Sequence, residues 1–238
     1  RKIKQLRNEC EQKGIPVISV DSKKKEKVGN FKNDGRTWRK DAKEVFDHDF
    51  PSDAEGKAIP YGIYDTIKNK ALVVVGTSSE TPEFATDAIE KWWCLHGRHE
   101  YKYANQIMIL ADCGGGNGYR CTVWKRDIQT KLCNRYGLTV TIGHYPPGAS
   151  KWNPIEHRLF SAISNSWEGI PLDSYEKVLN YITTTTTKTG LKVKAVLNEK
   201  EYSKGQTVSK LELANLNITQ NKLLPEWNYT IRPQKNVH

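Results

Sequence analysis

The stretch from residue 107 to residue 118, IMILADCGGGNG, decides the fold. Its apolar start, IMILA, has the length and composition of a buried β-strand, and Asp112 follows directly. The glycine-rich turn GGGNG leads to residues 121–136, where apolar side chains recur at helical spacing, and then to a second apolar run at 138–142. This strand–helix–strand order predicts a parallel sheet covered by helices.

Three more strands are predicted upstream. The run IPVISV at 15–20 is rich in β-branched residues and ends at Asp21. Residues 58–64 and 71–77 form two further strands, and the short polar link between them predicts an antiparallel hairpin. A helix then starts with Thr81 as its N-cap and a proline at the first helical position.

Together these elements predict an α/β fold of the ribonuclease H-like kind. We expect a mixed five-stranded sheet flanked by helices, in which the first three strands are antiparallel and the later ones parallel. Residues 1–187 would form this catalytic domain, with a long basic insertion at 22–57 after the first strand. Residues 188–238 would be a basic C-terminal appendage packed on the core.

Composition limits the partners and the compartment. The formal net charge is +10, which favours a polyanion as partner, although solubility alone could also explain it. Five cysteines without a CxxC spacing suit reduced thiols in a cytosol better than a disulfide framework. The sequence contains no signal peptide and no apolar run of membrane length, which predicts a soluble protein without a membrane partner.

Two aspartates follow predicted strands directly, namely Asp21 and Asp112. If the two strands are neighbours, both carboxylates emerge at one edge of the sheet, where open α/β sheets bind ligands. Carboxylates in this position suit Mg²⁺ or Mn²⁺. An aspartate after a strand can also simply begin a turn, and the spacing does not decide between these roles.

A third acid, Glu156, lies near the start of a helix that begins at Asn153 and Pro154. It occupies the N3 position of a capping box, so it can be structural, or it can join the two aspartates as a ligand. His144 and His157 flank this region, and their roles stay open. The GGGNG turn lacks the lysine of a phosphate-binding loop, which leaves a tight turn or a close approach to DNA.

Six motifs in order resemble one family: VISVD, GKAIPYGIYD, ILADCGGGNG, HYPPGASKWNPIEHRLFS, TTTTKTGLKVKA and WNYTIRP. They are similar to the catalytic region of the Rhodopirellula-type DDE transposases of bacterial insertion sequences, from about residue 15 to 233. The resemblance implies a DNA transposase, a metal-dependent polynucleotidyl transferase, with Asp21, Asp112 and Glu156 as its catalytic and metal-binding triad. Two Mg²⁺ or Mn²⁺ ions would be held there, Asp21 bridging both. Water would free a 3′-hydroxyl at the element end, and this hydroxyl would attack target DNA.

The resemblance also implies a location in the bacterial cytoplasm, associated with the nucleoid, and a set of partners. DNA at the element ends and at the target would be bound by a homo-oligomer, and an N-terminal DNA-binding region would be expected beyond Arg1. Lys23, Lys24, Lys25 and Lys151 are placed to hold phosphates, and Trp152 to stack on a base. Two alternatives remain: a hydrolytic nuclease of the same fold, and a non-catalytic DNA-binding protein derived from a transposase.

Overall fold

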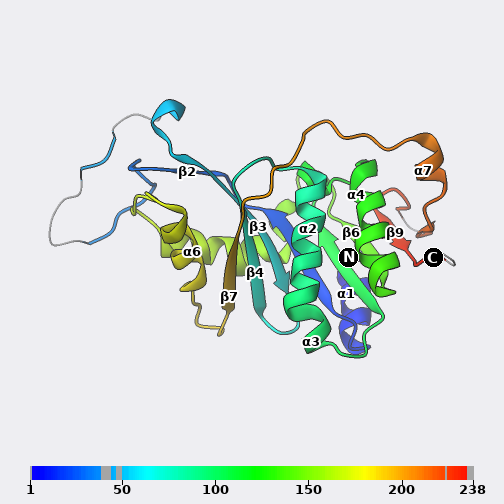
Figure 1. Ribbon diagram of the computed structural model, residues 1–238. Helices are drawn as coiled ribbons and strands as arrows, with labels where there is room; N and C mark the ends of the chain where they lie inside the picture. The colour runs from blue at the N-terminus through cyan, green and yellow to red at the C-terminus, as the bar shows by residue number, and fades with distance from the viewer. Residues whose placement is uncertain (1, 39–43, 47–49, 223, 235–238) are drawn as a thin grey trace.

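The structure, a computed structural model, describes residues 2–38, 44–46, 50–222 and 224–234. Its centre is one mixed sheet with the strand order β7-β4-β3-β1-β5-β6-β9-β8, and β2 pairs separately with β3 (Figure 1). The strands are β1 (Val17–Ser22), β2 (Glu26–Val28), β3 (Gly56–Asp65), β4 (Lys70–Gly76), β5 (Gln106–Ala111), β6 (Thr139–His144), β7 (Lys192–Asn198), β8 (Ile218–Gln220) and β9 (Asn228–Ile231).

The five strands expected from the sequence form the middle of this sheet. β1 pairs antiparallel with β3, and β3 pairs antiparallel with β4. β1 also pairs parallel with β5, and β5 pairs parallel with β6. The predicted change from antiparallel to parallel pairing is therefore confirmed, and β1 is the strand where the change occurs.

The described sheet has nine strands rather than five, because the C-terminal segment adds β7, β8 and β9 and the insertion after β1 adds β2. We expected residues 188–238 to pack on the core as an appendage. Instead, β7 extends one edge by parallel pairing with β4, and β9 extends the other by antiparallel pairing with β6. Lysines and asparagines interrupt these short strands, which hides them in the sequence, yet Val193, Tyr229 and Ile231 are buried.

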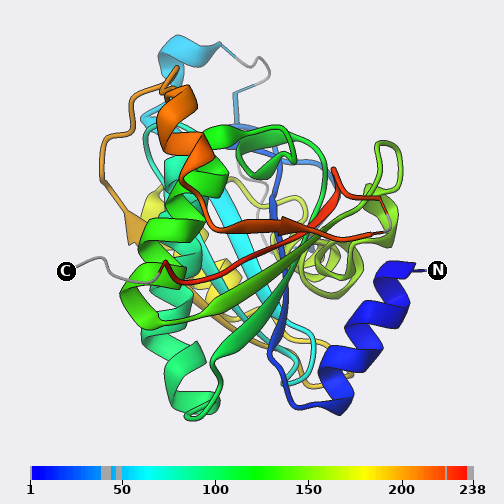
Figure 2. The ribbon, with the colours of Figure 1, turned by 90° about the vertical axis from the view of Figure 1, so that its right-hand side faces the viewer.

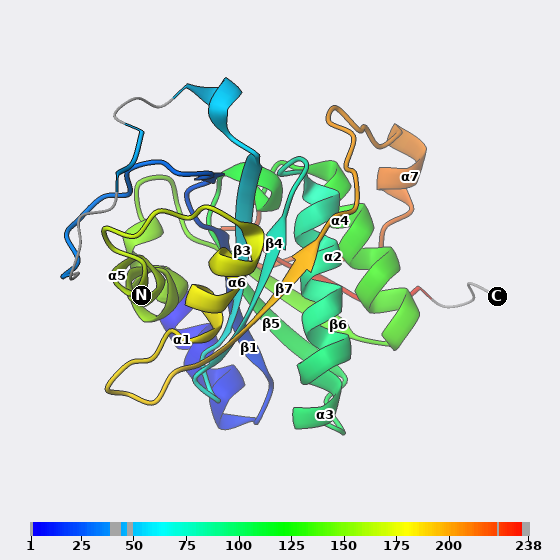
Figure 3. The ribbon, with the colours of Figure 1, turned by 60° about the vertical axis from the view of Figure 1, so that its left-hand side comes forward.

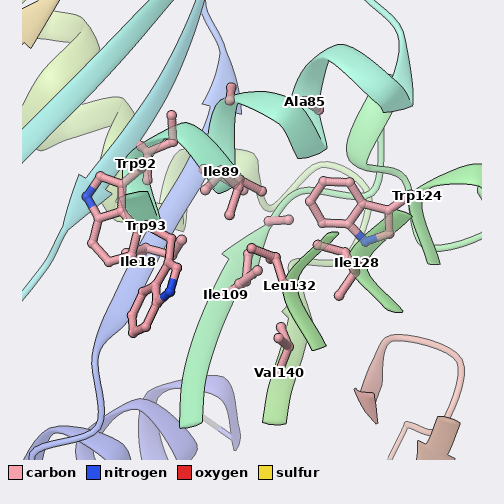
Figure 4. Close-up of a cluster of buried hydrophobic side chains, with 14 of the residues drawn as sticks. Ile18, Ala85, Ile89, Trp92, Trp93, Ile109, Trp124, Ile128, Leu132 and Val140 are labelled. Atoms are coloured by element: carbon pink, nitrogen blue, oxygen red, sulfur yellow. The ribbon is translucent and has the colours of Figure 1, made fainter. Parts of the chain in front are cut away.

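Helices cover both faces of the sheet (Figure 3). On one face, α2 and α4 with its continuation η4 bury the largest apolar cluster, in which Trp92, Ile89 and Trp124 lie over Ile18, Ile109 and Val140 (Figure 4). On the other face lie η6, α5 and α6. The helical segments are α1 (Lys2–Gln12), α2 (Pro82–Trp92), η2 (Trp93–Gly97), α3 (Arg98–Glu100), η3 (Gly115–Asn117), α4 (Thr122–Asp127), η4 (Ile128–Asn134), η5 (Ser150–Trp152), η6 (Glu156–Phe160), α5 (Ser161–Ser166), α6 (Tyr175–Thr183) and α7 (Lys210–Ala214).

The helix α2 begins as the sequence predicts. The Thr81 hydroxyl accepts a hydrogen bond from the backbone N–H of Phe84 at 3.1 Å, and Pro82 is the first helical residue. The helix α1 was not expected. It packs through Ile3 and Leu6 against Val17 and Met108, close to the start of β1 (Figure 2).

The insertion between β1 and β3 extends away from the sheet (Figure 1). It contains β2 and the short 3-10 helix η1 (Pro51–Asp53). The rings of Phe31 and Phe46 pack at 5.6 Å between centroids. Residues 39–43 and 47–49 lie outside the described part of the chain, as does any role expected for them. Within the described residues, no helix is both long and apolar enough to cross a membrane.

Candidate active site at the carboxyl ends of two parallel strands

The carboxyl ends of β1 and β5 bring Asp21 and Asp112 together. The two strands are parallel neighbours in which Val17 pairs with Met108 and Ser19 with Leu110. Continuing the same register by two residues places Asp112 level with Asp21. Asp21 is buried at 8% exposure, and Asp112 is half-buried. The expectation that both carboxylates reach one sheet edge is borne out by this geometry.

The glycine-rich turn after β5 holds the Asp112 carboxylate. One carboxylate oxygen, Oδ1, accepts hydrogen bonds from the Gly114 backbone N–H at 3.2 Å and from the Asn117 side-chain amide at 3.3 Å. Gly116 lies against the backbone of Thr81, so that an added Cβ would be 2.9 Å from the Thr81 carbonyl oxygen. The turn therefore needs glycine for close packing and orients an acid, which supports the tight-turn interpretation.

Glu156 reaches this edge on a helix that is fastened to β1. The Ser19 hydroxyl accepts a hydrogen bond from the Ile155 backbone N–H at 3.0 Å and donates one to Asn153 Oδ1 at 2.5 Å. Ser19 thus caps the helix from the neighbouring strand, while the Asn153 side chain is engaged with β1. Among the described residues, no hydrogen bond links the Glu156 carboxylate to the Asn153 N–H. The capping-box alternative for Glu156 is therefore wrong in this structure, because Ser19 takes the capping role.

A glycine in β3, Gly62, lets the helix that carries Glu156 approach the sheet. Gly62 pairs with Asp21 in the β1–β3 ladder. A Cβ at Gly62 would lie 2.7 Å from the Phe160 ring, 2.8 Å from Ile155 and 3.0 Å from Leu159. Such contacts are shorter than packed carbon atoms tolerate, so a larger residue would force these side chains, or the helix that carries them and Glu156, to shift.

The three carboxylates influence one another electrostatically. Burial, followed by the nearby Asp112 carboxylate and then Glu156, raises the pKa of Asp21 to about 8. Burial also raises the pKa of Glu156, and Asp112 adds to that effect. Charge crowding of this kind is characteristic of sites that bind cations. Among the described residues, no three acidic, histidine or cysteine side chains are close enough to form a finished metal-binding group.

Comparison with known proteins identifies the family. The Rhodopirellula transposase DDE domain family matches residues 1–233 of the chain. The chain belongs to this family. No curated protein sequence gave a match. Among solved structures, the chain is similar to Mos1 transposase in a paired-end complex with the left transposon end, with 12% sequence identity and a TM-score of 0.46. That similarity covers 75% of this chain and 50% of the Mos1 chain, so this chain spans about half the length of the Mos1 protein.

The DDE domain carries a fourth acid at this edge that sequence reasoning missed. Glu80 lies between β4 and α2 and contributes to the raised pKa of both Asp21 and Asp112, after burial. Its carboxylate forms an ion pair with Lys25 at 2.9 Å. Its only sequence signal is its place directly before the Thr81 cap, which gave no reason to link it with strands that are distant in the chain.

His144 supports the backbone of Asp112 from the neighbouring strand β6. It is fully buried at the end of β6, with Nδ1 2.8 Å from the Asp112 backbone oxygen and Nε2 3.1 Å from the Tyr229 hydroxyl. Since a carbonyl oxygen only accepts, Nδ1 carries the proton and Nε2 accepts from Tyr229. Burial lowers the pKa of His144 to about 4, so the ring is neutral at pH 7. His157 is exposed, and its Nε2 contacts the Lys151 carbonyl oxygen.

The expected DNA-contacting residues have different surroundings. The Lys23 side chain is only 8% exposed, pairs with Glu26 at 3.0 Å and lies 4.7 Å from the centroid of the Trp167 ring. Lys24 is exposed, and Lys25 is partly exposed beside Glu80. Lys151 lies 5.5 Å from the centroid of the Trp152 ring, and Trp152 is 68% exposed. Lys24, Lys25, Lys151 and Trp152 are thus accessible, whereas the Lys23 side chain is largely buried.

Proposed function

We propose that this DDE domain cleaves DNA strands at the ends of a mobile element and joins the freed 3′-hydroxyl to target DNA. The observation that carries the proposal is the position of Asp21 and Asp112 on adjacent parallel strands in matching register, with Glu156 on a helix fastened to the same strand. Burial and mutual repulsion raise the pKa values of Asp21 and Glu156 and cost stability in the folded protein. A function that needs their negative charge explains why these acids are kept.

The acids fit divalent cations by their chemistry. Hard cations such as Mg²⁺ and Mn²⁺ take oxygen ligands, and Asp21, Asp112 and Glu156 offer carboxylates at one sheet edge. The Tyr61 hydroxyl is buried without a hydrogen-bond partner among the described residues. Its pKa is raised by burial and then by Asp21, Asp112 and Glu80, which indicates that it lies beside the same acids. An orphaned hydroxyl here would suit a water molecule of a hydrated cation.

The protein's own groups would divide the work. Asp21, Asp112 and Glu156 would hold two ions, and the Gly114 N–H and the Asn117 amide would keep Asp112 oriented. Bound divalent cations would neutralise these acids and stabilise the charge that develops on phosphate oxygens during strand exchange. Lys24, Lys25 and Lys151 would contact DNA phosphates, and Trp152 would stack on a base. Lys23 would act mainly by supporting the chain beside Trp167.

The domain would act on DNA as a homo-oligomer, because both ends of an element must be joined to one target. A cleavage and joining assay on DNA that carries the element's own ends tests the function. We expect Mg²⁺-dependent nicking followed by transfer of the 3′-hydroxyl end into a second DNA molecule, with Asp21→Asn inactive and the exposed Glu199→Gln fully active. Nicking without joining would assign a hydrolytic nuclease. Binding without nicking would assign a non-catalytic DNA-binding protein.

A further inference from the structure

A small pocket is lined by residues from the start of α4 and from the strands β8 and β9. Its wall includes the aromatic side chains of Tyr119 and Tyr229 and the cationic side chains of Arg120 and Lys125. Gln220 adds an amide to this wall. The pocket therefore combines positive charge with aromatic surface, the pair of features that single-stranded nucleic acids require.

The two cations in the pocket lack acidic partners. Lys125 Nζ lies 5.1 Å from the centroid of the Tyr229 ring, and the Arg120 guanidinium lies 5.1 Å from that of Tyr119. Among the described residues, neither forms an ion pair, even though Glu226 also lines the pocket. Lys125 is half-buried, and burial lowers its pKa. A partly desolvated ammonium group without a counter-ion favours binding of an anion.

The pocket is connected to Asp112 through short contacts. The Tyr229 hydroxyl donates to His144, and His144 donates to the Asp112 carbonyl oxygen. Tyr119 directly follows the glycine-rich turn that holds the Asp112 carboxylate, and its ring centroid lies 6.3 Å from that of His144. A ligand in this pocket would therefore be joined to the backbone of Asp112 through Tyr229 and His144, and it would contact the residue that follows the Asp112 turn.

We infer that this pocket binds one unpaired nucleotide of the DNA strand next to the cleavage point. Lys125 and Arg120 would hold its phosphate, and Tyr119 would contact its sugar and base. This inference rests on the proposed function, since it assigns a position on the strand that the active site would cleave. It adds a substrate contact that none of the residues expected from the sequence provides.

Direct binding measurements test the pocket. The probes are a fluorescein-labelled mixed-sequence single-stranded oligonucleotide and the same strand in a duplex, titrated by anisotropy in EDTA over a series of salt concentrations. Lys125→Gln should reduce the salt slope of binding by about 0.7 for the single strand, the value for one phosphate contact, whereas Lys125→Arg should restore it. Tyr119→Ala should weaken single-strand binding by roughly tenfold, with a smaller effect on the duplex.

Matched controls come from two exposed residues that do not line the pocket. Lys192 is exposed on β7, and Tyr103 is 97% exposed before β5, so Lys192→Gln and Tyr103→Ala should both bind like the wild type. If wild-type protein binds and cleaves DNA while Lys125→Gln and Tyr119→Ala bind no differently from these controls, the pocket inference is overturned and the proposed function stands. If wild-type protein binds neither probe and cleaves no DNA, both fall.

Discussion

Removing the buried charge of Asp21 should stabilise the metal-free protein. Asp21 is 8% exposed, accepts one backbone hydrogen bond, from Ser22 at 2.8 Å, and shares its surroundings with Asp112 and Glu156. In Asp21→Asn the amide oxygen can keep the bond to Ser22, and the amide N–H groups can donate to the remaining carboxylates. The substitution thus replaces repulsion with hydrogen bonding in a site of nearly the same shape.

The size of this effect follows from the shifted pKa. The pKa of Asp21 rises from 3.8 to about 8 on folding, so at pH 7 the folded protein takes up a proton that the unfolded chain does not hold. Binding that proton at pH 7 costs about 4 kcal/mol of stability. Relaxation and water entry lower such costs, so we expect a gain of about 2–4 kcal/mol for Asp21→Asn in EDTA. For a chain of this length that corresponds to a rise of roughly 4–16 °C in Tm.

The pH dependence of stability tests the sign of this effect. Because the folded state binds this proton more tightly than the unfolded state, the contribution of Asp21 to stability is fully present below about pH 4 and is lost as the pH rises towards 8. Thermal melts in EDTA from pH 5 to pH 8 should therefore show the variant's advantage growing with pH, while exposed Glu199→Gln stays level with wild type. Mg²⁺ should raise the Tm of the wild type but not of the variant. An Asp21→Asn protein that melts at or below the wild-type temperature across this range would refute the claim that burial and nearby acids make Asp21 destabilising without metal.

Three further substitutions probe the architecture of the site. Glu156→Gln should abolish Mg²⁺-dependent strand cleavage. It should change the free energy of unfolding by less than about 1 kcal/mol, because Glu156 makes no capping hydrogen bond. If Glu156→Gln cleaves as well as the exposed control Glu176→Gln, Glu156 does not belong to the site. Gly62→Ala should lower the free energy of unfolding in urea by about 1–3 kcal/mol and slow cleavage by displacing the helix of Glu156. Adding Phe160→Leu should recover part of the stability and part of the cleavage rate. Unchanged stability and cleavage in Gly62→Ala would contradict the close packing. His144→Ala should weaken Mn²⁺ binding, measured by paramagnetic resonance, more than His144→Asn does, because asparagine keeps a hydrogen-bond donor for the Asp112 carbonyl. Equal Mn²⁺ affinities in the two variants would argue against a role of His144 in positioning Asp112.

Much of the fold could be predicted because each central strand is a continuous apolar run in the sequence. The apolar runs before Asp21 and Asp112 are continuous and buried, so periodicity alone locates them. The same holds for the start of α2, where Thr81 and Pro82 act through neighbouring residues. The strand β9 escaped prediction because it is short and becomes buried only by pairing with β6 and β8.

The missed parts of the site depend on contacts between distant segments. Ser19 caps a helix that begins 134 residues later in the chain, at Asn153, and no local pattern announces such a bond. The role of Gly62 depends on three side chains of the helix packed against it. Glu80 approaches Asp21 only because β4 ends and α2 starts at the same edge as β1. Strand-end positions pointed to Asp21 and Asp112, and only the family resemblance implied Glu156 as their third partner. The residues that support these acids emerge only from the packing.

The most direct test of the central claim is to locate bound metal. A crystal of the protein grown or soaked with Mn²⁺ and measured at the manganese absorption edge yields an anomalous difference map, which marks the ions independently of activity. We predict peaks between the carboxylates of Asp21 and Asp112 and beside Glu156, absent in Asp21→Asn crystals treated in the same way. A map without peaks at this edge of the sheet, or with Mn²⁺ only elsewhere on the wild-type protein, would contradict the assignment of these acids as a metal-dependent DNA-cleaving site.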